Sequence, residues 1–327
     1  MFEELLVNLL ILVLSLLVLT KASHLTITNA VKSADAVGIG KTTIGFILLA
    51  FSTSMPELLV SIFSALEGNI IGLAIGNVLG SNIVNVCLIL GTCIIIATFS
   101  KTRRNCIDFT SCVAEEEIGS LYFGLFMASI IPLILIYIKE ASRYVGAILL
   151  ALFIFNAYFM TKKRTSIYEE VSEKEKRKIF RYVLFLIIGI VGVIGSSYFL
   201  VDSAANIALT LGVPSVVIGA TVVAFGTSVP ELATSIEASR LGHLDMALGN
   251  IVGSGFINLT IILGATLVSS PFTVNIAAFS ELAIFSLIAN LFLWYFISSN
   301  KTSIKEGVIL VGLYALYLTT SFGGYKP

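Results

Sequence analysis

One stretch of this sequence occurs twice, and that duplication limits the fold more than any other feature of the chain. Residues 44–62 read IGFILLAFSTSMPELLVSI and residues 218–236 read IGATVVAFGTSVPELATSI, with 11 of 19 positions identical. A second pair follows at nearly the same offset: residues 74–91 (AIGNVLGSNIVNVCLILG) and 247–264 (ALGNIVGSGFINLTIILG) match at 9 of 18 positions. The sequence therefore predicts two copies of one structural unit.

The composition places both copies in a lipid bilayer. Apolar residues make up 57% of the chain and charged residues 12%, whereas soluble domains carry about 25% charged residues. A helix needs roughly 20 apolar residues to cross a bilayer. We expect an all-α polytopic membrane protein of ten transmembrane helices, with bounds near 5–20, 43–65, 70–99, 120–138, 143–161, 180–200, 215–238, 246–270, 275–297 and 306–322.

A polar run after the fifth apolar segment divides the chain into halves. We expect a first five-helix repeat over 1–161, a cytoplasmic linker over 162–179 and a second five-helix repeat over 180–327, all in one membrane domain. Five spans is an odd number, so the second copy is expected to enter the membrane upside down. Inverted repeats with interrupted helices are typical of secondary transporters, whose substrate site lies near the midplane where the repeats meet.

The positions of the basic residues predict the orientation. If the N-terminus is outside, 17 of the 20 Lys and Arg residues fall in cytoplasmic loops, as the positive-inside rule requires. We expect a multi-pass protein of the cell membrane with both termini extracellular and the central loop cytoplasmic. The formal net charge is zero, which argues against a nucleic acid partner. Membrane lipid is the expected surrounding, and no obligate protein partner is implied.

The first repeated motif carries a proline in the middle of an apolar segment. Proline lacks an N–H and clashes with the carbonyl four residues back; for Pro56 and Pro230 these carbonyls belong to Ser52 and Gly226. A freed carbonyl in lipid must find another partner. A bound cation is one such partner, because hard cations prefer carboxylates, carbonyls and neutral oxygens.

The same motif brings a carboxylate to the bilayer interior in each copy. Glu57 and Glu231 occupy equivalent positions, and neither has a Lys or Arg nearby in the sequence. An ionisable residue in a membrane span costs several kcal/mol and indicates a functional site. Thr53 and Thr227 precede the glutamates by four residues and share their helix faces. The threonines taken alone are equally compatible with hydrogen bonds to their own helix.

The second repeated motif adds amide and hydroxyl groups. Ser81 and Asn85 in the first copy, and Ser254 and Asn258 in the second, are four residues apart and face the same way. The glycines of this motif are spaced so that helices can approach closely. If the inverted copies pack together, four helices converge on one polar centre.

These two motifs resemble the alpha-repeat signatures of the sodium/calcium exchangers in the calcium/cation antiporter superfamily. The signatures are G-T-S-x-P-E and G-N-x-x-G-S-x-x-x-N, and the resemblance covers the whole chain. It implies inward and outward states, with the first and sixth helices sliding over the core. The Ca²⁺ and Na⁺ ligands that it implies are Thr53, Ser54, Glu57, Ser81, Asn85, Thr227, Ser228, Glu231, Ser254 and Asn258, with the carbonyls of Ala50 and Ala224.

The chain departs from the family pattern at two positions. Ser52 stands where the motif usually has glycine. Asn258 stands where some prokaryotic relatives have aspartate, so the site would carry two formal charges rather than three.

Three other functions compete with Na⁺/Ca²⁺ exchange by alternating access. An H⁺/Ca²⁺ exchanger would use the same two glutamates, although proton-coupled relatives typically carry G-N-x-x-E in place of G-T-S-x-P-E. An ion channel is disfavoured by the inverted repeat and broken helices. An intramembrane hydrolase would need a Ser–His pair or two aspartates in the membrane, and neither histidine suits that. We therefore expect no enzyme activity and no cofactor.

Overall fold

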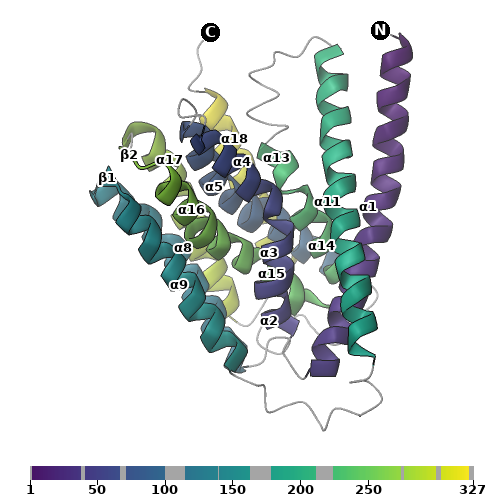
Figure 1. The fold of residues 1–327 in the computed structure, drawn as a ribbon, viewed down its shortest axis with the longest axis horizontal. Helices are drawn as coiled ribbons and strands as arrows, with labels where there is room; N and C mark the ends of the chain where they lie inside the picture. The colour runs from purple at the N-terminus through teal and green to yellow at the C-terminus, as the bar shows by residue number, and fades with distance from the viewer. Residues whose placement is uncertain are drawn as a thin grey trace.

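The computed structural model describes residues 2–37, 41–66, 71–99, 115–138, 140–162, 178–210, 224–273, 276–299 and 303–323, and these are almost entirely helical (Figure 1). One short antiparallel pair joins β1 (Glu140–Ala141) to β2 (Phe272–Thr273). The helices of the first half are α1 (Phe2–Val37), α2 (Lys41–Ile44), η1 (Gly45–Leu49), α3 (Ala50–Thr53), α4 (Met55–Leu66), α5 (Ile71–Ile83), η2 (Val84–Leu90), α6 (Gly91–Phe99), α8 (Glu115–Ile138) and α9 (Arg143–Lys162). Those of the second half are α11 (Ile179–Thr210), α13 (Ala224–Thr227), α14 (Val229–Arg240), α15 (Leu244–Ile257), η4 (Asn258–Ile262), α16 (Leu263–Ser269), α17 (Ile276–Ser298) and α18 (Ile304–Gly323).

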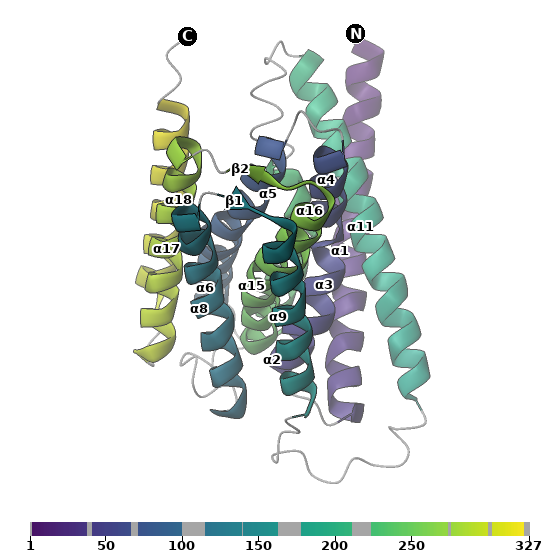
Figure 2. The ribbon, with the colours of Figure 1, turned by 60° about the vertical axis from the view of Figure 1, so that its left-hand side comes forward.

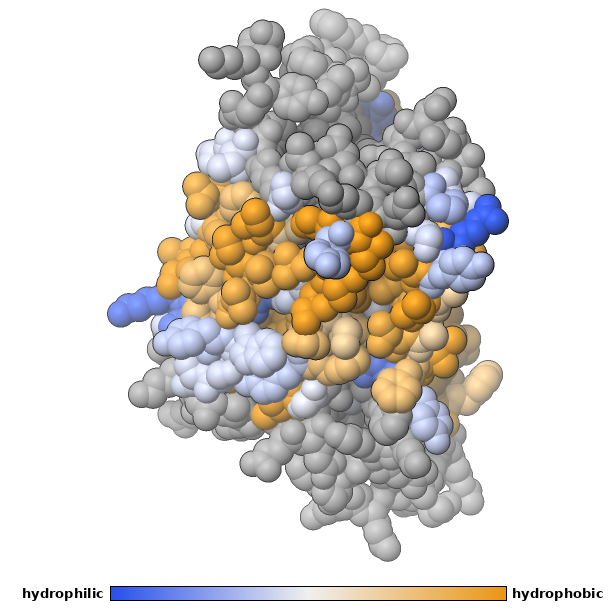
Figure 3. Space-filling model, turned by 90° about the vertical axis from the view of Figure 1, so that its left-hand side faces the viewer, coloured by the Kyte–Doolittle hydropathy of each residue, from blue (hydrophilic) through white to orange (hydrophobic). Residues whose placement is uncertain are grey.

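Several of the helices have the length and apolar surface of membrane spans. Apolar side chains form a broad central band on the face shown in Figure 3. Among the described residues, three apolar helices of 10–17 residues accompany five that are long and apolar enough to cross a membrane. The expectation of a polytopic helical protein is therefore confirmed, whereas the count of ten spans stays a prediction. Part of the expected span 215–238 and all of the central run 163–177 lie outside the described residues.

The first span is much longer than we expected from its apolar run. The sequence predicted a helix over residues 5–20, but α1 continues to Val37. Its polar C-terminal half is covered by other helices, and Thr26 and Asn29 there are buried. Their polar groups are satisfied within α1: Thr26 Oγ1 donates to the Ala22 carbonyl at 2.8 Å, and Asn29 Nδ2 donates to the Leu25 carbonyl at 2.8 Å. Lys21 and Lys32, which follow the expected span and count among the 17 basic residues expected in cytoplasmic loops, thus lie within α1.

Helices α1 and α11 form a long pair at one side of the molecule (Figures 1 and 2). They approach closely where a side chain at Gly189 would overlap Thr26. The pair meets the rest of the protein mainly through α14, where His24 Nδ1 lies 2.8 Å from Glu237 Oε1. The half of α1 that precedes Leu19 presents most of its leucines and valines outward, as a helix bordering lipid would.

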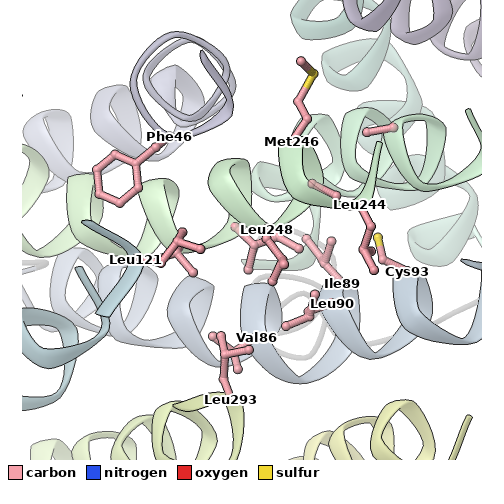
Figure 4. Packing of buried hydrophobic residues seen from close by; sticks show 14 of the residues in the cluster. Phe46, Val86, Ile89, Leu90, Cys93, Leu121, Leu244, Met246, Leu248 and Leu293 are labelled. Atoms are coloured by element: carbon pink, nitrogen blue, oxygen red, sulfur yellow. The ribbon is translucent and has the colours of Figure 1, made fainter. Parts of the chain in front are cut away.

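The interrupted helices form the centre of the fold around α15. Nearly all residues of α15 are buried. It touches η1, α2, α3, η2, α8 and α14. Gly249 and Gly253 permit the closest approach, because a side chain at either would overlap backbone atoms of Thr42 or Phe46. Figure 4 shows part of the surrounding core, where Phe46, Val86, Ile89, Leu90, Cys93, Leu121, Leu244, Met246, Leu248 and Leu293 lie close together.

The start of α1 and the end of α18 lie at the same end of the molecule (Figures 1 and 2). The β1–β2 pair also lies toward this end. The opposite end carries the close of α9 and the start of α11, which flank the central polar run. The orientation of these two ends relative to the cytosol stays a prediction.

Candidate cation-binding site

Each copy of the Thr-Ser-x-Pro-Glu motif interrupts a helix at its serine. Ser54 separates α3 from α4 with φ −83° and ψ 10°, and Ser228 separates α13 from α14 with φ −90° and ψ 6°. The proline two residues later would clash within a continuous helix, but it fits the first turn of a new one. The helix break that the prolines predict is therefore present at the same position in both copies.

The break places each glutamate in the first turn of the new helix, opposite the other copy of the motif. Ser54 Oγ donates to Glu231 Oε1 at 2.9 Å, and Ser228 Oγ donates to Glu57 Oε1 at 3.1 Å. The serine of each copy thus binds the carboxylate of the other. The positive end of each new helix also favours a carboxylate at this position.

Both carboxylates are enclosed by protein. Glu57 is 1% exposed and Glu231 is 0% exposed. No lysine or arginine is found among the buried side chains of the residues that the structure describes. Two neighbouring buried carboxylates repel each other and need a compensating positive charge or protons, because burial of an uncompensated charge is strongly unfavourable.

The two threonines of the motif also reach the opposite copy. Thr53 Oγ1 lies 3.4 Å from Asn250 Oδ1, and Thr227 Oγ1 lies 3.3 Å from Asn77 Oδ1. The Thr53 hydroxyl is also 3.0 Å from the carbonyl of Leu49 in its own helix. Both threonines therefore face the other copy, and Thr53 also bonds to its own helix, as the sequence allowed. Their role as cation ligands stays a prediction.

Asn77 and Asn250 are central to this arrangement, and our sequence reasoning missed them as site residues. Asn77 Nδ2 donates to the Glu57 carbonyl at 3.2 Å and to Ser61 Oγ at 3.1 Å. Asn250 Nδ2 donates to Ser235 Oγ at 2.9 Å. Both are the asparagine of the repeated G-N pair. Their repetition was a visible signal, but their link to the first motif depends on packing between helices.

The serines of the second motif differ between the copies. Ser254 Oγ donates to Glu231 Oε1 at 3.5 Å, a long hydrogen bond. Ser81 is 2% exposed, and its hydroxyl makes no hydrogen bond to any residue that the structure describes. The structure therefore brings Ser254 to a carboxylate, while Ser81 is buried without a comparable partner there.

The asparagines of the second motif lie in π-helical turns, Asn85 in η2 and Asn258 at the start of η4. Such turns occur frequently at functional sites. Asn258 Nδ2 donates to Asn82 Oδ1 at 3.3 Å, leaving Asn258 Oδ1 without a hydrogen bond within the described ranges. Neither amide atom of Asn85 is hydrogen-bonded within those ranges.

The two carbonyls that the resemblance implied lie on the helical turn before each break. The Ala50 carbonyl accepts the N–H of Ser54 at 3.0 Å, and a carbonyl oxygen retains a second lone pair. Ala224 begins α13, and the N–H of Ser228 reaches the carbonyl of Phe225 instead, at 3.1 Å. The backbone geometry of the two copies therefore differs slightly at this turn.

Buried oxygen atoms without hydrogen bonds gather in these residues. Carboxylate, amide and hydroxyl oxygens are the ligands that Ca²⁺ accepts. No group of three His, Cys, Asp or Glu side chains that could hold a metal ion occurs among the described residues. Among the residues of the two repeated motifs, the buried oxygens without a hydrogen bond to any described residue are Glu57 Oε2, Glu231 Oε2, Ser81 Oγ, Asn85 Oδ1 and Asn258 Oδ1. Elsewhere in the described ranges, buried hydroxyls without a hydrogen bond occur at Ser23, Ser33, Thr42, Ser197, Ser203 and Ser286.

Comparison with known proteins gives one consistent assignment. The sodium/calcium exchanger protein family matches residues 7–162 and 181–323. The sodium/calcium exchanger MaX1 of Methanosarcina acetivorans is 32% identical, covering 97% of this chain and 99% of that one. An uncharacterised membrane protein of Methanocaldococcus jannaschii is 31% identical over 94% of this chain and 95% of its own. A structure of the sodium-calcium exchanger NCX_Mj superposes with a TM-score of 0.83 at 27% identity, covering 96% and 99% of the two chains. The chain therefore belongs to the sodium/calcium exchanger family.

Proposed function

We propose that this protein is a secondary antiporter that exchanges Ca²⁺ for Na⁺ by alternating access, with Glu57 and Glu231 as the charged ligands. One observation carries the proposal: the serine of each motif binds the carboxylate of the other copy, at 2.9 and 3.1 Å. This cross-bonding brings both negative charges into one buried site. One Ca²⁺ or two Na⁺ would cancel the formal charge of −2.

The neutral oxygens favour sodium as the coupling ion. Protons need only the two carboxylates, whereas Na⁺ accepts hydroxyl, amide and carbonyl oxygens. Ser81 Oγ, Asn85 Oδ1 and Asn258 Oδ1 have no hydrogen bond within the described ranges, so they are available to such an ion. The proposed ligand set also includes Ser54, Ser228, Thr53, Thr227, Ser254 and the carbonyls of Ala50 and Ala224. With three Na⁺ per Ca²⁺, each cycle would move one net charge, worth about 2.3 kcal/mol per 100 mV.

Calcium uptake into proteoliposomes tests the coupling. Vesicles loaded with Na⁺ and diluted into Na⁺-free buffer with radioactive Ca²⁺ should accumulate Ca²⁺. Vesicles with a pH gradient and no Na⁺ should not. Uptake driven by the pH gradient alone would replace sodium coupling with H⁺/Ca²⁺ exchange. Na⁺-driven uptake that ignores an imposed membrane potential would reject the third sodium ion.

We further propose a multi-pass orientation in the cell membrane with both termini outside and the central loop inside. The two halves, 1–161 and 180–327, would then form the inverted repeats on either side of the linker 162–179. In a variant lacking the four native cysteines, a cysteine at Glu140 should react only from the extracellular side and one at Ser172 only from the cytosolic side. The reverse pattern of labelling would overturn the orientation.

A further inference from the structure

A second asparagine of α5, Asn82, lies beside the proposed ligands without being one of them. It is 2% exposed and directly follows Ser81 in the chain. Its Oδ1 accepts the hydrogen bond from Nδ2 of Asn258 at 3.3 Å. This bond crosses between the copies, because Asn82 belongs to the first half and Asn258 to the second.

The hydrogen bond between Asn82 and Asn258 has no equivalent between the corresponding residues of the opposite copies, Gly255 and Asn85. The residue equivalent to Asn82 in the second copy is Gly255. A side-chain carbon at Gly255 would lie 3.5 Å from Asn82 Oδ1, so the Asn82 amide rests against this glycine. Asn85, the equivalent of Asn258, has no hydrogen bond to either amide atom from any described residue. Only one of the two equivalent asparagines is thus held by a neighbouring amide.

Holding an amide by its nitrogen determines which atom is offered to a cation. An asparagine carries an oxygen acceptor and a nitrogen donor of similar shape, and half a turn about its last bond exchanges them. A cation binds only the oxygen. While Nδ2 of Asn258 is bonded to Asn82, Oδ1 of Asn258 is on the opposite side of the amide, where it makes no hydrogen bond to any described residue.

We propose that Asn82 is a positioning residue for cation transport, which acts by fixing the Asn258 amide with its oxygen toward the bound ion. The inference rests on the proposed function, in which Asn258 is a ligand. Outer-shell partners that orient a metal ligand typically change metal affinity 10- to 100-fold when removed. Asn82 therefore affects how tightly the ion is held without contacting it.

The test measures initial Ca²⁺ uptake into proteoliposomes over a range of external Ca²⁺, together with equilibrium Ca²⁺ binding in detergent. Asn82→Ala should raise the KM and the Kd for Ca²⁺ about tenfold, with a maximal rate within about twofold of wild type. Asn82→Leu restores most of the volume but not the acceptor, so it should behave like Asn82→Ala. A role in packing alone predicts that Asn82→Leu recovers the wild-type KM, and that recovery would overturn the proposal.

A double-mutant cycle then asks whether Asn82 acts through Asn258. Asn82→Ala should have no further effect on KM in an Asn258→Ala background, whereas independent roles would give multiplicative effects and contradict the inference. Gly255→Ala is the matched control, because it adds a methyl group in ordinary contact with Asn82 and leaves the hydrogen bond between Asn82 and Asn258 intact.

Equilibrium binding of Ca²⁺ separates the proposal for Asn82 from the proposed sodium coupling. If the wild-type protein binds Ca²⁺ but exchanges it only for protons, sodium coupling is rejected, and the effect of Asn82 on Ca²⁺ affinity can still be measured. A wild type that binds no Ca²⁺ overturns both.

Discussion

Ser254 and Asn258 in the second copy are held by hydrogen bonds, whereas their counterparts in the first copy, Ser81 and Asn85, are not held by any described residue. Ser254 and Asn258 each donate to a buried acceptor. Ser81 and Asn85 make no hydrogen bond with any part of the chain that the structure describes. Duplication of a sequence thus produced the same helix breaks and the same ligand types, but two different sets of partners. We therefore expect the bound ion to supply the missing partners of Ser81 and Asn85 in the first copy, whereas the protein supplies those of Ser254 and Asn258 in the second.

Neutralising either glutamate should have the largest effect, and it should be equal in the two copies. Glu57→Gln and Glu231→Gln keep the side-chain shape and the acceptor for the opposite serine but remove half of the site's charge. Each carboxylate would form a buried pair of opposite charges with the bound Ca²⁺, and removing one member of such a pair costs about 3–5 kcal/mol. We therefore expect Ca²⁺ affinity to fall by more than about 100-fold. Radioactive Ca²⁺ uptake, normalised to protein inserted in the vesicles, is the measurement. Near wild-type uptake by either variant would remove that glutamate from the ligand set.

Glycine substitutions should separate the two copies by their packing. Gly253→Ala would force a methyl group onto the backbone of Phe46 and onto Ala50, whereas at Gly80 the nearest described atom is the Tyr317 hydroxyl at 4.0 Å. Overpacking of a tight interior costs about 1–3 kcal/mol or more. We expect Gly253→Ala to lower the unfolding temperature and the yield of folded protein, and Gly80→Ala to leave both near wild type. Equal losses in size-exclusion profiles and melting curves would show that the copies are packed alike.

The common features of the two copies could be predicted from the sequence because each follows from local chemistry. A proline within an apolar segment breaks the helix, and a carboxylate beside it is buried, so Glu57 and Glu231 could be placed without a structure. The polytopic helical fold followed from the hydropathy of the chain. The presence of hydroxyls and amides near the carboxylates followed from spacing within single helices.

The differences between the copies could not be predicted, because they depend on contacts between helices. Nothing in the spacing of Asn82 or Asn77 indicates which hydrogen-bond partner its amide will meet. The Asn82–Gly255 difference was visible in the alignment of the copies, but its meaning needed the 3.3 Å bond to Asn258. The predicted length of the first helix was too short for a related reason. Hydropathy identifies the lipid-facing part of a helix but not the polar part that other helices cover.

Substituting the asparagines should affect Ca²⁺ affinity less than substituting the glutamates, and the two asparagine variants should differ in stability. We expect Asn85→Ala and Asn258→Ala each to raise the KM for Ca²⁺ about tenfold, because a neutral oxygen contributes less than a carboxylate to holding a divalent ion. Asn258→Ala also leaves the buried oxygen of Asn82 without its partner, which costs about 1–3 kcal/mol. The melting temperature in Ca²⁺-free buffer should therefore be lower than wild type for Asn258→Ala but not for Asn85→Ala. The reverse order would contradict the assignment of partners.

The smallest effects should come from the serines, and they should differ in sign. Ser81 buries a hydroxyl without a hydrogen bond to any described residue, and such a group is destabilising until an ion binds it. Ser81→Ala should therefore stabilise the protein by about 1 kcal/mol in buffer free of Ca²⁺ and Na⁺. Ser254→Ala removes a 3.5 Å bond to Glu231 and should destabilise it by about 0.5 kcal/mol. Thermal unfolding in detergent, with choline replacing sodium and a chelator present, measures both shifts.

Adding Ca²⁺ provides the control for this sign difference, because ligand binding stabilises a protein according to RT ln(1 + [L]/Kd). If the Ser81 hydroxyl is a ligand, its loss raises the Kd, and the Ca²⁺-induced increase in melting temperature should be smaller in Ser81→Ala than in wild type. The same substitution would then stabilise the ion-free protein and weaken the ion-bound one. A Ser81→Ala protein that melts lower than wild type without ions would show that Ser81 has a partner in the fold. The protein would then supply the partner of Ser81 in the first copy, as it supplies that of Ser254 in the second.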